Sequence, residues 1–505
     1  MPKWIDNILN RTTMYRLVLY YLEVLLGAAF VFSFFGILPF GPAELVFSAA
    51  VIMAVCIAAN WIFAKVFDAV TNVESVYITA FILALIIPPA VATDAAGIGF
   101  LIFVSVWAMA SKYLFALGKR HLFNPAAFGA ALSALLIGRA ATWWVGGNLA
   151  LLPFVLVGGL LVVRKIQRTD LVASFALVAL VTSAVTAGQG NAWTAIVQTI
   201  IHSAFFFFAF IMLTEPLTTP PNRPLRIAYG ALVGFLFAPN VNIGGFYLSP
   251  ELALLIGNIF SYIVSPKGRY MLTLKRIEEA ANDAYDFVFS PDRRFSFAPG
   301  QYMEWTLAHD GSDNRGNRRY FTLASAPTES TVRLGVKFYP KASTFKQTLA
   351  AMKVGDRISA AHLSGGFVLP RNKKKKLVFI AGGIGITPFR SMIRYLLDKG
   401  EQRDIVVLYS NKAPDDIAYG DILERARTEL GVRTVYAVTD GNASSSGVYA
   451  GKIDAGLIMR QIPDYRDRTF YISGPHAMVE AFEKTLKDMG VSRFRIKSDF
   501  FPGFA

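Results

Sequence analysis

The chain is poor in the two residue types that most often hold redox metals. Cysteine occurs once in 505 residues, as Cys56, and histidine occurs five times. One cysteine excludes an intrachain disulfide and leaves too few thiolates for an iron–sulfur cluster held by this chain alone. Two histidines, His121 and His202, lie in the apolar first half, where a pair of bis-histidine hemes would need four. We therefore expect no metal site.

Charge is also scarce, but unevenly so. Charged residues make up 17% of the chain, against about a quarter in soluble domains. Residues 1–268 hold 14 Lys/Arg and 9 Asp/Glu, whereas residues 269–505 hold 36 and 26. The first half is therefore membrane-like and the second resembles a basic soluble protein. Because Lys and Arg are spread along the chain, we expect no nucleic-acid partner; the one run, Lys373–Lys376, is interpreted as a solvated turn near anionic lipid headgroups.

Long apolar segments dominate residues 1–266. A helix of about 20 apolar residues spans a bilayer, so the sequence predicts a polytopic α-helical membrane domain of about ten helices, in contact with lipid. The candidate segments are 17–39, 44–66, 76–92, 96–117, 123–138, 149–163, 170–187, 194–213, 226–239 and 247–265. We find no removable signal peptide pattern at the N-terminus.

Positive charges alternate between these segments. If the N-terminus is cytoplasmic, the outside loops hold only Arg139, as the positive-inside rule requires. The inside loops then hold Lys65, Lys119, Arg120, Arg164, Lys165, Arg168, Arg223 and Arg226. An even helix count returns the chain to the cytoplasm. We expect a multi-pass protein of a bacterial-type inner membrane, with its N-terminus and its C-terminal domain both cytoplasmic.

The hydrophobic pattern changes after a short linker at residues 265–268. Alternating segments such as 284–289 and 332–338 predict strands. Beyond Leu377, apolar runs alternate with helical stretches, which is typical of a parallel α/β sheet. We therefore expect three domains: a membrane domain at 1–266, a strand-rich domain at 267–371 and an α/β domain at 372–505.

A glycine-rich turn, GGIGITP, occupies residues 382–388, between an apolar run and a helical pattern. Glycines at such a turn allow backbone amides to approach a pyrophosphate, and the helix N-terminus favours its negative charge. A purely structural turn would explain this motif equally well, so its meaning depends on its neighbours.

The neighbouring motifs occur in a fixed order. They are PGQY at 299–302, RYFTLAS at 319–325, STFK at 343–346, SGGF at 364–367, SGP at 473–475 and DFFPGF at 499–504. This set resembles the ferredoxin–NADP reductase superfamily over about 235 residues. The resemblance implies an antiparallel six-stranded β-barrel that binds FAD, a parallel α/β domain that binds NAD(P)H, and an NAD(P)H-dependent flavin oxidoreductase activity.

The resemblance also implies roles for single residues around FAD. Arg319 would neutralise the pyrophosphate, and Phe321 stands where the family usually has a tyrosine against the flavin ring. Thr322 would hydrogen-bond to flavin N5, the atom that accepts the hydride. The other FAD candidates are Tyr320, Lys337, Thr344, Gly365 and Gly366, of which the last three would hold phosphate groups.

For the nicotinamide dinucleotide the candidates are Gly382, Gly383, Gly385, Thr387, Pro388, Gly474 and Pro475. The family often has a cysteine near the nicotinamide where this chain has Ser473, which we expect to act with Thr322 at the reacting atoms. The family's terminal Glu-x-Phe appears as Asp499-Phe500-Phe501. Phe500 is either a flavin cover that nicotinamide displaces or part of a packed C-terminus. Ser410 and Lys412 could accept the 2′-phosphate of NADPH, but we favour NADH because members with similar segments often use it.

Two proline-rich segments interrupt the apolar half on its predicted cytoplasmic side: HLFNPAAFG at 121–129 and LTEPLTTPPN at 213–222. Broken backbone at membrane depth lines cofactor or substrate sites. The segments resemble the FNPA and TDP-x-T-x-P motifs of two related membrane proteins, NqrB of the sodium-translocating NADH:quinone reductase and RnfD of the Rnf complex. The resemblance implies two five-helix repeats, with Asn124 and Glu215 as candidate cofactor contacts.

That family carries FMN covalently on a threonine of a Ser/Thr-Gly-Ala-Thr motif, which this sequence lacks. We therefore expect any FMN or riboflavin in the membrane domain to be noncovalent. Glu215 is either a functional acid at membrane depth or a carboxylate that caps the break and pairs with Arg223. His202 is interpreted as part of an interhelical hydrogen bond.

Together these features predict that cytosolic NAD(P)H reduces FAD and that the membrane domain passes electrons to a membrane or extracytosolic acceptor. Candidate acceptors are an extracytosolic flavoprotein, a quinone or partner membrane subunits. Because a bilayer core is about 30 Å thick, the electron needs an intermediate station, and a flavin or bound quinone is the remaining candidate. The alternatives are a redox-regulated small-solute transporter, an NADH:quinone reductase at the membrane surface, and a heme-type transmembrane reductase. The last of these needs paired histidines on its membrane helices, which this sequence lacks.

Overall fold

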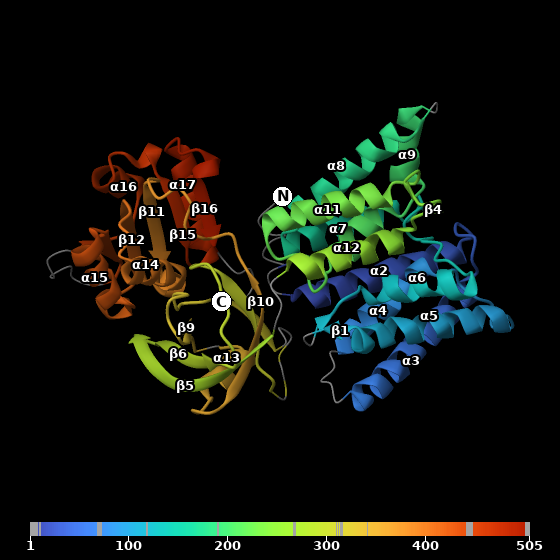
Figure 1. Cartoon of the computed structure of the whole chain (residues 1–505), viewed down its shortest axis with the longest axis horizontal. Coiled ribbons are helices and arrows are strands. Elements are labelled where there is room, and N and C mark those ends of the chain that lie inside the picture. The colour runs from blue at the N-terminus through green and yellow to red at the C-terminus, as the bar shows by residue number, and fades with distance from the viewer. Residues whose placement is uncertain are drawn as a thin grey trace. The chain divides into compact units, whose positions relative to one another are not determined.

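A computed structural model of the chain divides into two compact units, Met1–Lys267 and Gly268–Ala505 (Figure 1). Each unit has hydrophobic cores of its own. The structure describes residues 9, 12–67, 73–117, 120–188, 191–265, 269–309, 311, 313, 317–340, 342–440 and 448–499.

The first unit is helical (Figure 1). Its helices are α2 (Met14–Phe34), α3 (Pro42–Val66), α4 (Val73–Ile86), α5 (Ala95–Leu114), α6 (Pro125–Ile137), α7 (Leu152–Ile166), α8 (Thr169–Val185), α9 (Ala192–Ile201), α10 (Phe205–Phe207), the π-helix η1 (Phe208–Met212), α11 (Arg223–Phe237) and α12 (Pro250–Val264). Two small hairpins pair β1 (Ala116–Leu117) with β2 (Arg120–His121) and β3 (Asn242–Ile243) with β4 (Phe246–Tyr247).

Each of the ten predicted membrane segments contains a helix, but several of these helices are shorter than a full span. Within the described residues, α2, α3 and α5 are long and apolar enough to cross a membrane. The bent pair of α9 with α10 and η1 would add a fourth span if the chain crosses as one unit. The helical, apolar character of the unit is as predicted, whereas the count of ten spans stays a prediction.

The predicted segment 194–213 is bent by 63° between α9 and α10. Ser203 explains the break locally, because its hydroxyl donates to the Thr199 carbonyl oxygen at 2.5 Å and accepts from the Phe205 amide at 3.2 Å. A side chain that takes over backbone hydrogen bonds in this way competes with the regular helix.

Glycines bring two helix pairs into backbone contact. A Cβ added at Gly230 or Gly234 of α11 would lie 2.6 Å or 2.5 Å from a carbonyl oxygen of α8. A Cβ added at Gly129 of α6 would lie 2.5 Å from the Val104 oxygen of α5. Small residues four apart are typical of closely packed membrane helices. The proline-rich segments 121–125 and 213–222 lead directly into these two closely packed helices.

The second unit begins with an antiparallel sheet of β5 (Tyr270–Ala281), β6 (Ala284–Pro291), β7 (Tyr302–Thr306), β8 (Arg318–Thr322), β9 (Val332–Lys337) and β10 (Arg357–Ser364). The strand order is β8-β7-β10-β5-β6-β9, so β8 and β9 form the edges. Its core contains Phe289 and Trp305, and it is completed by Phe345 of α13 (Thr344–Ala350). This curled sheet is the counterpart of the expected barrel (Figure 1).

A parallel sheet follows, with strands β11 (Leu377–Gly382), β12 (Ile405–Asn411), β13 (Arg433–Val438), β14 (Val448–Ala450), β15 (Thr469–Ser473) and β16 (Ile496–Asp499) in the order β14-β13-β12-β11-β15-β16. Strand β11 is buried on both faces, as central parallel strands are. Helices α14 (Thr387–Lys399) and α15 (Gly420–Leu430) contribute to one core, and α16 (Ala455–Gln461) and α17 (His476–Asp488) to the other.

Candidate functional site

Four strand ends meet at the carboxyl edge of the parallel sheet. Ala381 of β11 pairs with Ser473 of β15, Gly382 pairs with Ser410 of β12, and Ser473 pairs with Asp499 of β16. In open α/β sheets, ligands bind outside this edge. The structure therefore places the glycine-rich turn and the SGP segment side by side where a ligand is expected.

The glycines of these two segments touch each other through their backbones. A Cβ on Gly385 would lie 2.5 Å from the Ser473 oxygen and 2.6 Å from the Gly474 Cα. Gly474 has φ +158° and its Cβ position lies 3.2 Å from the Gly382 Cα. Side chains at these positions would force the strand ends apart. The 3₁₀ turn Gly383–Ile386 then leads into α14.

Thr387 and Pro388 form the first turn of α14, and Pro475 caps α17. The Thr387 hydroxyl donates to the Ile384 carbonyl oxygen at 3.2 Å, which closes the turn on itself. Proline suits a first helical turn because its missing N–H has no partner there. Phe500, predicted as a flavin cover, lies outside the described residues.

Thr322 connects the antiparallel sheet to this edge. It is the last residue of β8, is 5% exposed, and lies close enough to Asp499 for its hydroxyl to lower the pKa of that carboxyl. Burial raises the pKa of Asp499 to about 7, and the hydrogen bond from Thr322 opposes this rise. The two residues expected at the reacting atoms, Thr322 and Ser473, are thus linked through one carboxyl residue. Asp499 entered the sequence argument only as a departure from the family pattern.

The other residues of RYFT alternate along β8. Arg319 is 4% exposed, with its guanidinium 5.2 Å from the centre of the Phe345 ring and 3.7 Å from Asp313. Tyr320 is partly buried and donates from its hydroxyl to Glu304 at 2.8 Å. Phe321 is also partly buried and packs 5.9 Å from Phe345, measured between ring centres.

Thr344 is brought close to Arg319 through Asp313. The Thr344 amide donates to the Asp313 carboxylate at 3.2 Å, and the Thr344 hydroxyl accepts from the Asp313 amide at 3.0 Å. A cation, a hydroxyl and a loop amide therefore gather in one place. Gly365 has φ +115° and lies against Tyr302, whereas a Cβ on Gly366 would meet open space.

Lys337 lies apart from that group. Its ammonium contacts Asp416 at 2.6 Å, and its carbonyl oxygen accepts from Lys346 at 3.0 Å. The predicted role of Lys337 beside FAD stays a prediction. In this structure its ion pair connects β9 to the 3₁₀ turn Pro414–Asp416.

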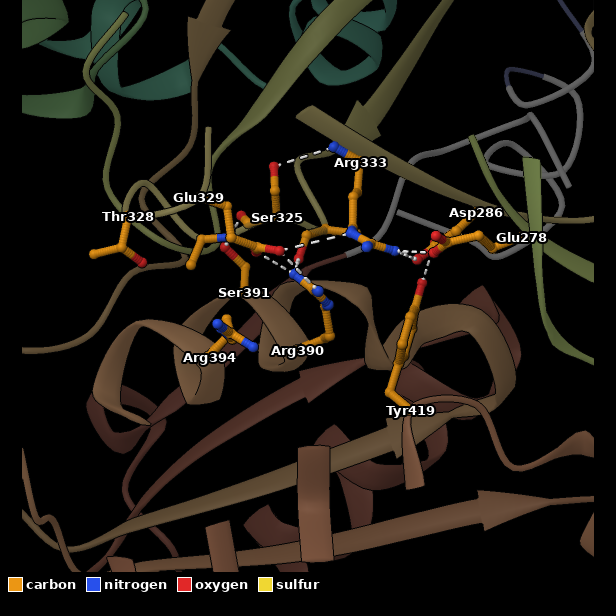
Figure 2. A network of polar contacts seen from close by, with 12 residues as sticks. Glu278, Asp286, Ser325, Thr328, Glu329, Arg333, Arg390, Ser391, Arg394 and Tyr419 are labelled. Carbon is orange, nitrogen blue, oxygen red and sulfur yellow. Dashed lines mark hydrogen bonds and ion pairs between the residues drawn. The ribbon is translucent and has the colours of Figure 1, made fainter. Parts of the chain in front are cut away.

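Figure 2 shows a polar network that joins the antiparallel sheet to α14. Arg390, 4% exposed, donates from both terminal nitrogens to Glu329 and from one of them to the Ala324 oxygen at 2.9 Å. Ser391 donates to the Ser325 oxygen at 2.7 Å. Because Ala324 and Ser325 closely follow Thr322, the network connects the end of β8 with the helix that follows the glycine-rich turn.

Arg333 and Tyr419 extend this network. Arg333 donates to Glu278 at 2.5 Å and to Asp286 at 3.1 Å, and the Tyr419 hydroxyl donates to Asp286 at 2.5 Å. Burial raises the pKa of Asp286, although its donors oppose the rise. These side chains line a cleft of about 330 Å³. The sequence did not predict the network, because its partners lie as far as 61 and 133 positions apart without any periodic signal.

In the first unit, the two proline-rich breaks meet in a buried polar cluster. Glu215 accepts from the Asn124 side-chain amide at 2.9 Å and contacts His121 Nε2 at 3.2 Å. Asn258 of α12 accepts from the Asn124 backbone amide at 2.8 Å and donates to the Tyr229 hydroxyl at 3.1 Å. Tyr229, Asn258 and Asn124 are at most 4% exposed. The cluster therefore extends from the break into the core of the unit.

One expectation for this region is wrong in detail. Among the described residues, Glu215 has contacts with His121, Asn124 and Thr218, and none with Arg223. Arg223 instead begins α11, and the nearer histidine and amide satisfy the carboxylate. His202 ends α9, and within the described part of the chain its side chain makes no interhelical hydrogen bond, contrary to its interpretation.

Comparison with protein families finds one match within each unit. Residues 379–484 match the family described as the oxidoreductase NAD-binding domain, and residues 134–267 match the NQR2, RnfD, RnfE family. The two resemblances inferred from the motifs are thereby confirmed: the chain joins an NQR2, RnfD, RnfE-type segment to an oxidoreductase NAD-binding domain.

Known proteins resemble somewhat less than half of the chain. An NADPH oxidoreductase of Mycobacterium tuberculosis is 29% identical over 233 residues, which are 45% of this chain and 57% of the relative. Flavohemoprotein A of Dictyostelium discoideum is 25% identical over 247 residues, 46% of this chain and 60% of the relative. The chain thus spans little more than half the length of these relatives.

Solved structures resemble a similar share of the chain. The FAD/NAD-binding domain of nitric oxide dioxygenase from Vibrio cholerae is 21% identical with a TM-score of 0.42, covering 46% of this chain and 98% of that one. A ferredoxin NADP+ reductase from Neisseria gonorrhoeae is 20% identical with a TM-score of 0.40, covering 47% of this chain and all of the other.

Proposed function

We propose that this chain is a membrane-bound flavin oxidoreductase that takes hydride from cytosolic NAD(P)H onto FAD and passes electrons through its membrane unit to a membrane or extracytosolic acceptor. The observation that carries the proposal is the contact of Thr322 with Asp499, which pairs in register with Ser473 beside the glycine-rich turn. Hydride transfer needs flavin and nicotinamide at one point, and these residues come from the two sheets that would hold them. NADH is the favoured donor.

The residues present fit a flavin dinucleotide. Arg319 and Thr344 gather around Asp313, so a guanidinium and a hydroxyl would be available together as donors to phosphate groups. Gly365 adopts a conformation that favours glycine, and Gly366 leaves open space next to it. When bound, FAD accepts a hydride and releases electrons one at a time. Thr322 would donate a hydrogen bond to flavin N5 in place of Asp499.

The nucleotide edge fits a dinucleotide for a different reason. Gly385 lies against the backbone of Ser473 and Gly474, and Gly383 has φ +51° with open space at its Cβ position, so a pyrophosphate could approach the amides at the start of α14. Ser473 would place its hydroxyl beside the nicotinamide. Asp499, with its pKa near 7, would hold or give up a proton next to Thr322.

In the membrane unit, the cluster of Asn124, Glu215 and His121 supports the proposal that a noncovalent FMN or riboflavin binds between the two breaks. Amide, carboxylate and imidazole groups offer both donors and acceptors for a polar ring system. The unit would thereby supply the station that electrons need within the bilayer. The N-terminus and the second unit are proposed to face the cytoplasm, so a reporter fused after Ala505 should be active only there.

The central test is reduction of the bound flavin by NADH in the purified chain under anaerobic conditions. Arg319→Ala removes a charge-assisted phosphate contact worth about 1.5–3 kcal/mol, so FAD affinity should fall by about tenfold or more. Arg427→Ala is the matched control, because Arg427 forms an exposed pair with Glu424 on α15. Equal FAD retention in both variants would contradict the assignment of RYFT to FAD binding. If NADH did not bleach the flavin absorbance, the proposed function would be excluded.

A further inference from the structure

The amino edge of the parallel sheet collects four charged segments that are far apart in the sequence. Leu377 of β11 pairs with Ile405 of β12 and with Thr469 of β15, and Phe470 pairs with Ile496 of β16. Because all these strands are parallel, the residues just before each of them lie at the same edge. The segments are 373–376, 401–404, 464–468 and 493–495, which we call the basic edge.

The basic edge carries a large surplus of positive charge. Its nine cations are Lys373, Lys374, Lys375, Lys376, Arg403, Arg466, Arg468, Arg493 and Arg495, against the four acids Glu401, Asp404, Asp464 and Asp467. The surplus of five is half of the net +10 of residues 269–505. The charge of the second unit is therefore concentrated on this edge.

The acids of the edge are engaged by cations beside them. Asp464 contacts Arg468 and Lys376, each at 2.7 Å, and hydrogen bonds from these partners lower the pKa of Asp464 to about 2. Glu401 contacts Lys373 at 2.6 Å and Arg403 at 2.7 Å. Among the described residues, no carboxylate lies within ion-pair distance of Lys374, Lys375 or Arg493. These three exposed cations remain for a partner outside the fold.

An exposed aromatic side chain lies between two of these cations in the sequence. Phe494 is 87% exposed, and the Arg493 guanidinium lies 5.8 Å from the centre of its ring. Arg495 follows it, and its guanidinium is held by the Arg466 carbonyl oxygen at 2.5 Å. Interfacial membrane-binding segments combine basic residues with an aromatic ring that enters the headgroup region. Neither feature is explained by packing within the unit.

We propose that the basic edge docks on the anionic leaflet of the membrane that contains the first unit, with Phe494 inserted among the headgroups. The proposal rests on the membrane assignment and on the cytoplasmic orientation given under the proposed function. Basic residues near an anionic bilayer surface are attracted to it, by roughly fivefold in the binding constant for each charge. Five residues separate Val264 of α12 from Tyr270 of β5, so connectivity keeps the second unit near that surface.

Docking through this edge is compatible with catalysis. The glycine-rich turn, Ser473 and Asp499 lie at the carboxyl ends of the same strands, whereas the basic edge lies at their amino ends. A leaflet bound to one edge leaves the other open to nucleotide from solution. The interaction would therefore fix the orientation of the reductase without covering its site.

The experiment uses the full chain in lipid nanodiscs. The single cysteine makes labelling simple: Cys56→Ser removes it, and Ser492→Cys places one fluorophore next to Phe494. A lipid-borne quencher is then added to discs of phosphatidylcholine alone or mixed with phosphatidylglycerol. We expect strong quenching in the anionic discs, weak quenching in the neutral ones, and loss of the difference at high salt, because salt screens exposed charges.

Two matched variants make the result decisive. Replacing Lys374, Lys375 and Arg493 together by glutamine should lower the ratio of docked to undocked protein by about a hundredfold. A label at Thr439→Cys, exposed just beyond the carboxyl end of β13, should escape quenching. Equal quenching in both disc types, or quenching at both label sites, would overturn the proposal. The proposal would also be overturned if burial of the Ser492 label required an added acidic protein rather than anionic lipid.

NADH-dependent flavin reduction, measured in the same discs, separates this inference from the proposed function. If flavin is reduced at the normal rate but the label never approaches lipid, docking fails while the reductase assignment stands. If flavin is not reduced, the proposed function fails independently of the label. FAD retention by the triple variant confirms that it is folded.

Discussion

Asp499 is the residue where several independent features of the second unit coincide. It ends the last described strand, pairs with Ser473, and accepts a hydrogen bond from Thr322 of the other sheet. Carboxyl groups with a perturbed pKa cluster at functional sites and are candidates for proton handling. The residue with the elevated pKa is therefore also the residue that connects Thr322 with Ser473.

The pKa of Asp499 predicts a specific dependence of stability on pH. Burial raises this pKa to about 7 in the folded chain, against about 3.9 in an unfolded one. Between about pH 4 and 7 the folded state binds the extra proton, so stability falls as the pH rises through this window. The melting temperature of the Asp499→Asn variant should not show the fall with rising pH that this carboxyl causes. A difference between wild type and variant that stays constant from pH 4 to 8 would contradict the raised pKa.

Arg390 acts at the residue scale without reaching the reacting atoms. Its bidentate pair with Glu329 and its bond to the Ala324 oxygen hold α14 against the segment that follows Thr322. The glycine-rich turn is at the start of α14 and Thr322 is at the end of β8. Arg390 is therefore placed to set the distance between the two halves of the site.

We predict that Arg390→Met slows hydride transfer more than it weakens binding. A misplacement of about 1 Å can cost about a hundredfold in rate, so the rate constant should fall by about 10- to 100-fold while the NADH KM changes much less. Arg390→Lys should restore activity only in part, because lysine keeps the charge and loses the bidentate geometry. Arg394→Met is the control, since the ion pair of Arg394 with Asp398 lies within α14. A loss of rate that only tracks loss of FAD would show a structural role instead.

At the scale of elements, periodic sequence patterns predicted helices and strands better than closeness in sequence predicted side-chain contacts. The apolar run Leu377–Ala381 predicts a buried strand before a glycine turn, and β11 is such a strand. The bend between α9 and α10 was missed because one hydroxyl, on Ser203, redirects the backbone bonds within an otherwise apolar segment. The pairing of Glu215 with Arg223 was wrong because closeness in sequence outweighed the histidine and asparagine that the fold brings nearer.

The contact between the glycine-rich turn and the SGP segment gives a prediction about elements. Gly385→Ala would place a Cβ 2.5 Å from a backbone oxygen of β15, and backbone cannot yield cheaply. Overpacking of this kind costs about 1–3 kcal/mol. We expect lower thermal stability and a weaker NADH affinity with FAD retained. Gly420→Ala, where the nearest atom lies at 3.9 Å in a helix, should be neutral or slightly stabilising, as differential scanning calorimetry and NADH titration can show.

At the scale of the whole molecule, the chain joins an NQR2, RnfD, RnfE-type segment to an oxidoreductase NAD-binding domain. A reductase that only served soluble acceptors would gain nothing from a helical unit with a buried polar cluster. That cluster, at Asn124, Glu215 and Asn258, costs free energy in an apolar setting unless its groups are paired. Hydrogen bonds between three segments pair these groups and fix the arrangement of the cluster.

The last prediction concerns the cofactor of the membrane unit. If this unit relays electrons, gently purified protein should contain more than one flavin per chain, and denaturation should release all of it, because the motif for a covalent link is absent. Glu215→Gln keeps the shape of the side chain but removes the charge that His121 and Asn124 contact. Transfer from NADH to an acceptor across the membrane should then fall, while NADH oxidation by soluble dyes continues. Glu44→Gln is the control, since Glu44 caps α3 through the Gly41 amide. One flavin per chain together with normal transfer in Glu215→Gln would exclude the relay and favour quinone reduction at the membrane surface.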